Sequence, residues 1–283
     1  MTEQIGLAAE PIPGEEPALI AQQPPPGAPF IAIGVPAMDF VDTEFALCFA
    51  TQLASFRGLT AMINSQGCYV DEGRMECVTQ AKRKRLKLPD GQVVRPSHLM
   101  FIDSDMTFPA QAIQRLLSHG VTDVVGCVYS RRVEPFTNIG MTEDPTIENA
   151  PESSPLIPMK LIGTGMMLIH MSVFDRMPEF DADGPVFGYK WLPEVGKYER
   201  EDVRFCRLVR EAGMKIWCDV GLSHHIGHVG KAIYRVDEAS KRLAAIAGMQ
   251  ATRETGIAPG LVDISKRPPP QPAPLPNGAQ AAE

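Results

Sequence analysis

Short apolar runs alternate with longer segments of helical periodicity through the middle of this chain. The apolar runs are four to six residues long and are bounded by proline, glycine or acidic residues, as buried strands are. We expect strands at residues 30–35, 59–64, 99–102, 124–129 and 215–220, with a further apolar run at 161–169. Such alternation is typical of an α/β fold with a mostly parallel central sheet flanked by helices.

Capping residues and glycines mark where the intervening helices begin and end. Asp42 or Thr43 can cap the first, and Thr107 can cap the third, with Pro109 in its first turn. Gly213 ends the helix that begins with two acidic residues. The expected helices cover residues 43–53, 71–81, 109–117, 201–212 and 237–249.

The two ends of the chain are rich in proline and show no periodicity. Such segments cannot bury enough apolar surface to offset the entropy of ordering them. We therefore expect disordered tails at residues 1–28 and 251–283, and a single domain over residues 29–250. Its hydrophobic content of 44% and charged content of 22% are those of a globular protein.

Charge, apolar runs and cysteines exclude several classes of protein. The formal net charge of −7 argues against a protein that coats nucleic acid, although a local basic groove remains compatible with it. No stretch reaches the roughly 20 apolar residues of a transmembrane helix. The six cysteines contain no Cys-X-X-Cys pair, which argues against a zinc site. We expect a cytoplasmic protein of open oligomeric state.

Two carboxylates follow the apolar run at residues 99–102 directly, in the order Asp103, Ser104, Asp105. In an open α/β sheet, ligands bind just beyond the carboxyl ends of the strands. Aspartates at this spacing can present oxygen atoms to a hard divalent cation, which can bridge two phosphates. A second Asp-X-Asp, at residues 181–183, follows no strand and is interpreted as a surface turn.

A second polar cluster lies about a hundred residues further along the chain. Glu201 and Asp202 stand at the start of a predicted helix, where acidic residues also favour the helix dipole. His224, His225 and His228 follow in a glycine-containing segment. Neutral imidazole is a metal ligand, and a solvated polar loop is the alternative interpretation.

Taken together, these motifs resemble the GT-A-fold glycosyltransferases that use nucleotide sugars, the large family-2-like group. The resemblance covers roughly residues 30–235 and implies a Rossmann-like nucleotide-binding half. It implies Mn²⁺ or Mg²⁺, with a nucleoside-diphosphate sugar, UDP-linked by preference, as co-substrate. The implied nucleotide-binding residues are Ala32, Pro36, Arg74, Asp103, Ser104, Asp105, Gly163, Thr164 and Gly165.

The same resemblance assigns roles to the later motifs. Asp202, with Glu201 before it, is similar to the general base of inverting members, which removes the proton of the acceptor hydroxyl. His228 or His225 resembles the late histidine that joins Asp103 and Asp105 at the metal. Trp191, in the segment 184–196, could stack on a sugar or base, or could anchor that loop.

Two other functions stay open at this point. A nucleotidyltransferase also uses paired aspartates, but it normally has a glycine-rich basic loop after its first strand. The other alternative function is that of a non-catalytic module that binds a nucleotide sugar without transferring the sugar.

The acceptor is also open: a polysaccharide, a lipid-linked sugar, a protein or hydroxymethylated DNA, the last as in phage-encoded enzymes. For DNA, the basic run 82–87 would line a groove, whereas its structural alternative is a helix end.

Overall fold

The structure is a computed structural model that describes most of the predicted domain. The described residues are 18–19, 24–25, 27–37, 40–66, 69–132, 137–143, 156–177, 180–230 and 233–235. The chain divides into two compact units, Met1–Leu243 and Ala244–Glu283, and every described residue belongs to the first. The helix predicted at 237–249 and most of both predicted tails lie outside the described residues.

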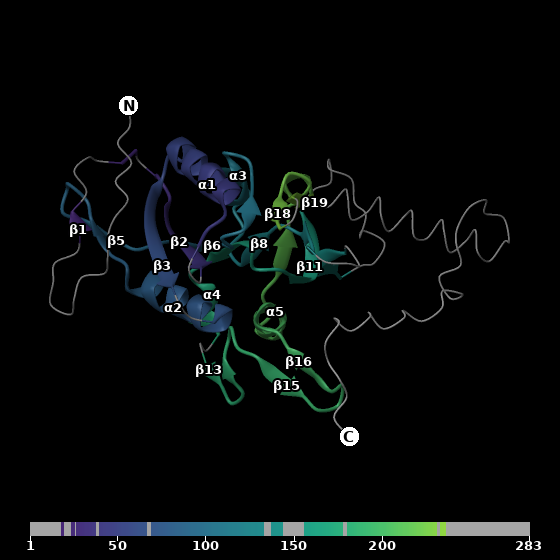
Figure 1. Ribbon diagram of the computed structural model, residues 1–283. Coiled ribbons are helices and arrows are strands. Elements are labelled where there is room, and N and C mark those ends of the chain that lie inside the picture. Colours follow the sequence, from purple (N-terminus) through teal and green to yellow (C-terminus); the bar gives the residue numbers. More distant parts are fainter. Residues whose placement is uncertain are drawn as a thin grey trace, which may run out of the picture. The chain divides into compact units, whose positions relative to one another are not determined.

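A nine-stranded sheet forms the centre of the described unit (Figure 1). In sheet order its strands are β3 (Leu59–Gln66), β2 (Phe30–Ala37), β6 (His98–Ile102), β12 (Met166–His170), β8 (Val124–Gly126), β17 (Ile216–Cys218), β11 (Ile157–Ile162), β10 (Asn138–Thr142) and β9 (Tyr129–Ser130). Six strands run in one direction, and β12, β11 and β9 run in the other. The predicted α/β class is confirmed, and the pairing is mixed because β12 separates two groups of parallel strands.

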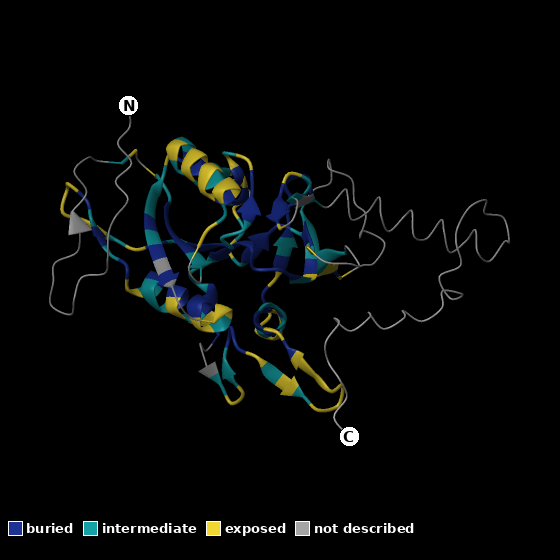
Figure 2. Ribbon diagram, in the orientation of Figure 1, coloured by how far each residue is buried: buried dark blue, intermediate teal, exposed yellow. Residues whose placement is uncertain are grey.

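Helices cover both faces of this sheet, as predicted. On one face lie α1 (Thr43–Ser55) and α3 (Ala112–Ser118), and on the other α2 (Val70–Arg83), α4 (Val173–Arg176) and α5 (Glu201–Glu211) (Figure 1). Alternate strand residues supply the two cores: Ile31 and Ile33 pack with α1 and α3, whereas Ala32 packs with α2 and α5. Figure 2 shows the consequence, buried central strands beneath helices whose outer faces are exposed.

The first three parallel strands create a switch in the direction of the chain. From β2 the chain passes through α1 to β3 on one side, and then through α2 to β6 on the other side of β2. Successive crossovers therefore lie on opposite faces, and a crevice between the carboxyl ends of β2 and β6 is the expected ligand position. Asp103 and Asp105 follow β6 at that position.

Three expected elements differ from the structure in their limits. The run at 124–129 breaks into β8 and β9, and the run at 215–220 divides into β17 and the short helix α6 (Val220–Ser223). The third helix begins at Ala112 and not near Pro109, because Met106 and Thr107 form a strand, β7. β7 pairs with β18 (Gly227–Val229), and β18 with β19 (Ile233–Arg235), which a local pattern cannot reveal.

Three further hairpins among the described residues lie outside the nine-stranded sheet. A turn that contains residues 89–91 joins β4 (Leu86–Lys87) to β5 (Val93–Val94), and β1 (Ala18–Leu19) pairs with β4. The second Asp-X-Asp lies in the turn between β13 (Phe180–Asp181) and β14 (Gly184–Pro185), which confirms the surface-turn interpretation. The strands β15 (Lys190–Leu192) and β16 (Lys197–Glu199) form the hairpin that precedes α5.

Candidate functional site

Both aspartates of the first Asp-X-Asp lie in the tight segment between β6 and β7. The Met106 amide donates to the Asp103 carbonyl, and the Asp42 amide donates to the Ser104 carbonyl, which ties this segment to the start of α1. The side chains of Asp103 and Asp105 are about a quarter and a fifth exposed. They are thus held by backbone contacts and remain accessible to a ligand.

The guanidinium of Arg74 joins the first aspartate to the acidic start of α5. Arg74 is buried in the first turns of α2, and its Nη2 donates to Asp103 Oδ1 at 3.0 Å. Its Nε lies 3.7 Å from Glu201 Oε1, and its guanidinium stacks over the Phe101 ring at 5.4 Å. Burial alone would lower the pKa of Arg74, but Asp103 and Glu201 outweigh it and raise that pKa. The side chain therefore stays cationic.

A separate cluster surrounds the second aspartate. His228 Nε2 lies 3.5 Å from Asp105 Oδ2, and Arg132 Nη1 lies 2.7 Å from the same oxygen. Burial opposes ionisation of Asp105, but the hydrogen bond and charge of His228 and the charge of Arg132 outweigh it. The pKa of Asp105 therefore lies below its ordinary value, and the group is a carboxylate at neutral pH.

Long-range strand pairing brings His228 to this place. In the β7–β18 ladder His228 pairs with Met106, and the Val229 amide donates to the Asp105 carbonyl at 2.7 Å. His228 Nδ1 donates to the Ser130 carbonyl at 2.9 Å, which leaves Nε2 as the ring nitrogen that faces Asp105. His225 is exposed after α6. The geometry thus favours His228 over His225 as the histidine of this site.

Glu201 and Asp202 begin α5, and both carboxyl groups are largely enclosed. Burial raises the pKa of Glu201, and Arg74 only partly offsets that effect. Burial likewise raises the pKa of Asp202, although its Oδ1 accepts from the Val203 amide. A carboxylate with a raised pKa is a better proton acceptor. The Arg74 charge acts on both groups and the Asp103 charge acts on Glu201, so the two acidic motifs influence one another.

The loop of Gly163, Thr164 and Gly165 between β11 and β12 packs against the buried ring of Tyr129. The Tyr129 hydroxyl accepts from the Gly165 amide at 3.0 Å, and a Cβ at Gly163 or Gly165 would lie 2.4 or 2.6 Å from that oxygen. Both glycines are therefore required by Tyr129. Tyr129 is thus a residue of the site for which the sequence offers no local signal.

Tyr129 also contacts the cluster around Asp105, because its ring packs edge to face on the His228 ring, with 5.2 Å between the ring centroids. Burial raises the pKa of Tyr129 well above its ordinary value, and the Asp103 charge adds to this. The phenol therefore stays protonated. It links the glycine loop to His228 at the centre of the site.

Three other predicted nucleotide-binding residues have different positions. Ala32 of β2 is fully buried in the core beside α2, because alternation along the strand directs its side chain to that face, and its place at the edge of a base pocket stays a prediction. Pro36, near the end of β2, is half-buried and remains at the sheet edge. Trp191 is half-exposed on β15 and packs against Tyr198 at 4.9 Å, so its role in stacking on a ligand stays a prediction.

The expected divalent-cation site can be compared with the donor atoms that the structure brings together. Within the described ranges no group of three or more His, Cys, Asp or Glu side chains could by itself hold a metal ion. Asp105 Oδ2 and His228 Nε2 nevertheless provide an oxygen and a nitrogen donor side by side. Mg²⁺ and Mn²⁺ often take only a few protein ligands, with phosphate and water completing the shell. These two donors would fit a divalent cation only if ligands from outside the protein completed its shell.

The basic run at 82–87 behaves as a helix end. Arg85 Nη1 donates to the carbonyl oxygens of Lys82 and Lys84, and Lys84 is buried. The run stands at the C-terminus of α2, about 14 Å along the helix from Arg74. Since α2 returns from the carboxyl edge of the sheet, this places the cations at the opposite edge from Asp103.

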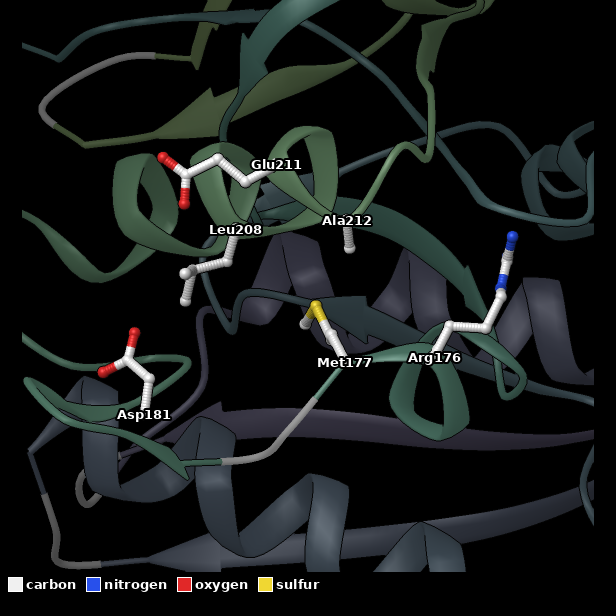
Figure 3. A pocket seen from close by; sticks show the side chains of 6 residues that line it. All are labelled: Arg176, Met177, Asp181, Leu208, Glu211 and Ala212. Carbon is white, nitrogen blue, oxygen red and sulfur yellow. The ribbon is translucent and has the colours of Figure 1, made fainter.

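One pocket lies apart from the acidic site. It has a volume of about 180 Å³ and is lined by Arg176, Met177, Asp181, Leu208, Glu211 and Ala212. Figure 3 shows Leu208 of α5 and Met177 after α4 directed toward each other at its centre. Asp181 also accepts from the buried Arg204 of α5, which fixes the β13–β14 turn beside this pocket. None of its lining residues belongs to the predicted site.

Comparisons with known proteins give matches among solved structures alone. No family profile matches the chain, and no curated protein matches it. Among solved structures it is similar to A197 from STIV, with a TM-score of 0.44 and 14% identity, over 74% of this chain and 91% of that chain. At this similarity no residue role transfers from A197. Among the described helices, none is long and apolar enough to span a bilayer.

Proposed function

We propose that this protein is a glycosyltransferase that moves a sugar from a nucleoside diphosphate to an acceptor hydroxyl with the help of Mn²⁺ or Mg²⁺. The observation that carries the proposal is the convergence, at the β2/β6 switch point, of Asp105 with His228 and of Asp103 with Arg74. Metal donors and a buried cation thus stand together where an α/β sheet receives its ligand.

The two aspartates have different tasks in this proposal. Asp105 and His228 would hold the cation, which supplies charge neutralisation to the departing diphosphate. Asp103 is engaged by Arg74, so it acts as the anchor of the site and as a weaker donor. Arg74 Nε and Nη1 are buried without a hydrogen-bond partner among the described residues, so Arg74 would act on an anionic ligand through its charge.

Asp202 is the general base of the proposed reaction. It would take the proton of the acceptor hydroxyl as that oxygen forms a bond to the anomeric carbon and the bond to the diphosphate breaks. Burial raises the pKa of Asp202 and thereby strengthens it as a base, while the Val203 amide fixes one carboxyl oxygen. Direct attack on the side opposite the diphosphate gives inversion.

The acceptor of the proposed reaction is a hydroxyl compound of undetermined class. The position of the basic run 82–87 argues against a hydroxymethylated DNA base as the acceptor. The run lies at the sheet edge opposite Asp103, where it could not guide DNA to the candidate site. Replacing Lys82, Arg83, Lys84 and Arg85 together by alanine should accordingly leave any DNA affinity unchanged. A fall of affinity with a reduced salt slope would restore DNA as the acceptor.

Calorimetric titration of UDP and GDP, with and without Mn²⁺, tests the proposal. Wild-type protein should bind at least one of them only with Mn²⁺, and Asp105→Ala should lose that binding. Asp183→Ala is the matched control, because Asp183 belongs to the second Asp-X-Asp and pairs with Lys190 on the surface. If neither nucleotide binds in the presence of Mn²⁺, the proposed glycosyltransferase function is rejected.

A further inference from the structure

Arg132 is a second cation of the candidate site, and it lies at the candidate metal position. It follows β9, and its Nη1 lies 2.7 Å from Asp105 Oδ2 and 3.2 Å from the Val229 carbonyl, to which it donates. The side chain is 45% exposed, unlike the buried Arg74. The guanidinium of Arg132 is therefore hydrogen-bonded to β18, but its half-exposed side chain has room to change conformation.

The oxygen that Arg132 contacts is the one that faces His228. His228 Nδ1 donates to the Ser130 carbonyl, so the nitrogen that faces Asp105 Oδ2, at 3.5 Å, is Nε2. The Arg132 guanidinium contacts the same carboxylate oxygen at 2.7 Å. It thus supplies a positive charge at the place where a divalent cation would also supply one.

We propose that Arg132 and the divalent cation compete for Asp105 Oδ2, and that Arg132, once displaced, binds the diphosphate of the donor. The inference rests on the proposed function for its second half only. A guanidinium offers a planar fork of donors that matches two phosphate oxygens, and a short rotation of a half-exposed side chain suffices to redirect it. The nucleotide thus stabilises the displaced conformation, and binding of metal and nucleotide becomes cooperative.

This arrangement has two consequences of opposite sign. Without Arg132, Asp105 loses a competing partner, so Mn²⁺ alone should bind about fivefold more tightly, the size of an exposed ion pair. The diphosphate loses a charge-assisted contact, so the nucleotide in saturating Mn²⁺ should bind roughly tenfold more weakly. A variant that was merely misfolded would weaken both interactions.

The experiment uses the full chain in three forms: wild type, Arg132→Gln and Arg131→Gln. Arg131→Gln removes the same charge from the neighbouring residue, whose amide donates to the Thr137 carbonyl. Electron paramagnetic resonance of free Mn²⁺ gives the affinity for the metal alone. Calorimetry with UDP and with GDP in saturating Mn²⁺ gives the nucleotide affinity, and thermal unfolding checks that each variant is folded.

The outcomes separate the inference from the proposed function. Tighter Mn²⁺ binding with weaker nucleotide binding in Arg132→Gln, and little change in Arg131→Gln, supports the inference. Mn²⁺ affinity that is unchanged or lower in Arg132→Gln overturns the competition, even if the wild type binds nucleotide well. Unchanged nucleotide affinity overturns the diphosphate contact. Absence of nucleotide binding in all three forms rejects the proposed function, while the Mn²⁺ titration still decides the competition.

Discussion

The Arg74 guanidinium lies among groups of opposite charge and has almost no contact with water. It hydrogen-bonds Asp103, faces Glu201 and stacks over the Phe101 ring. A buried cation with one good partner is stable only while its counter-charges are present, and the same holds for the carboxylates around it. Arg74 is thus a residue at which loss of charge and loss of stability are coupled.

Arg74→Met should lower the free energy of unfolding by about 3 kcal/mol at neutral pH, because it leaves buried carboxylates without their cation. Arg74 holds down the pKa of Glu201, which burial raises, so the variant takes up a proton at higher pH than the wild type. Its folded state therefore gains protons on acidification, and the difference in stability should shrink as the pH falls. Urea unfolding at several pH values measures this.

The exposed Arg57 provides the control for this change. Arg57→Met removes the same charge and should alter the unfolding free energy by less than about 0.5 kcal/mol at every pH. A pH-independent loss in Arg74→Met would show that packing, and not charge, makes up the contribution of Arg74.

Gly165→Ala tests the contact between the glycine loop and Tyr129. The new Cβ would lie 2.6 Å from the Tyr129 hydroxyl and 3.2 Å from Asp103 Oδ2, so we expect a loss of about 1–3 kcal/mol in stability. In a Tyr129→Leu background, which lacks the phenol, the same change should cost less. Chemical denaturation of the four proteins gives the coupling energy, and additive effects would exclude the contact.

At the scale of elements, a second buried carboxylate connects α3, β17 and α6. Asp219 caps α6 by accepting from the Leu222 amide, and it accepts two hydrogen bonds from Arg115 of α3 and contacts His119. Burial works against its ionisation, but these hydrogen bonds outweigh burial and lower the pKa of Asp219. The element contacts therefore depend on an ionised group that lies outside the candidate site.

Asp219→Asn should cost about 2 kcal/mol at pH 7, a value reduced because the Arg115 side chain is 45% exposed. A depressed folded-state pKa stabilises the protein above the unfolded value of about 4, and this contribution is lost as the pH falls through the folded value. The difference between variant and wild type should therefore vanish in acid. Glu194→Gln, an exposed charge change, should show no such dependence in thermal unfolding, and equal profiles for both would contradict the linkage.

For the molecule as a whole, binding and folding are linked through the candidate site. Its parts come from β6, α2, α5, β9 and β18, so they meet only in the folded chain. A ligand at one hundred times its dissociation constant stabilises the folded state by about 2.7 kcal/mol. We therefore expect Mn²⁺ with UDP or GDP to raise the melting temperature by roughly 5–10 °C.

Removal of the metal tests this linkage. Excess EDTA should abolish the nucleotide-dependent rise, and Asp105→Ala should never show it, whereas Asp183→Ala should behave as the wild type does. A rise that persists in EDTA would show that the nucleotide binds without a cation, with Arg74 and Arg132 as its cationic partners.

The sequence by itself determined the α/β class, the helices on both faces and the position of Asp103 and Asp105 beyond a buried strand. These follow from short-range periodicity, because a run of apolar residues needs neighbours on both sides wherever it lies. The limits of α3 and the antiparallel insertion of β12 were not predictable in this way. β7 and β12 are fixed by partners far along the chain.

The tertiary structure alone decided the composition of the site. In the structure His228, and not His225, lies beside Asp105, and Ala32 is buried in the core. The basic run lies at the far edge of the sheet, and Arg132 contacts Asp105. Each of these depends on a contact between residues distant in sequence, or on which face of an element a side chain occupies. Residue type and spacing define which groups can do the chemistry, whereas strand pairing and burial define which of them meet.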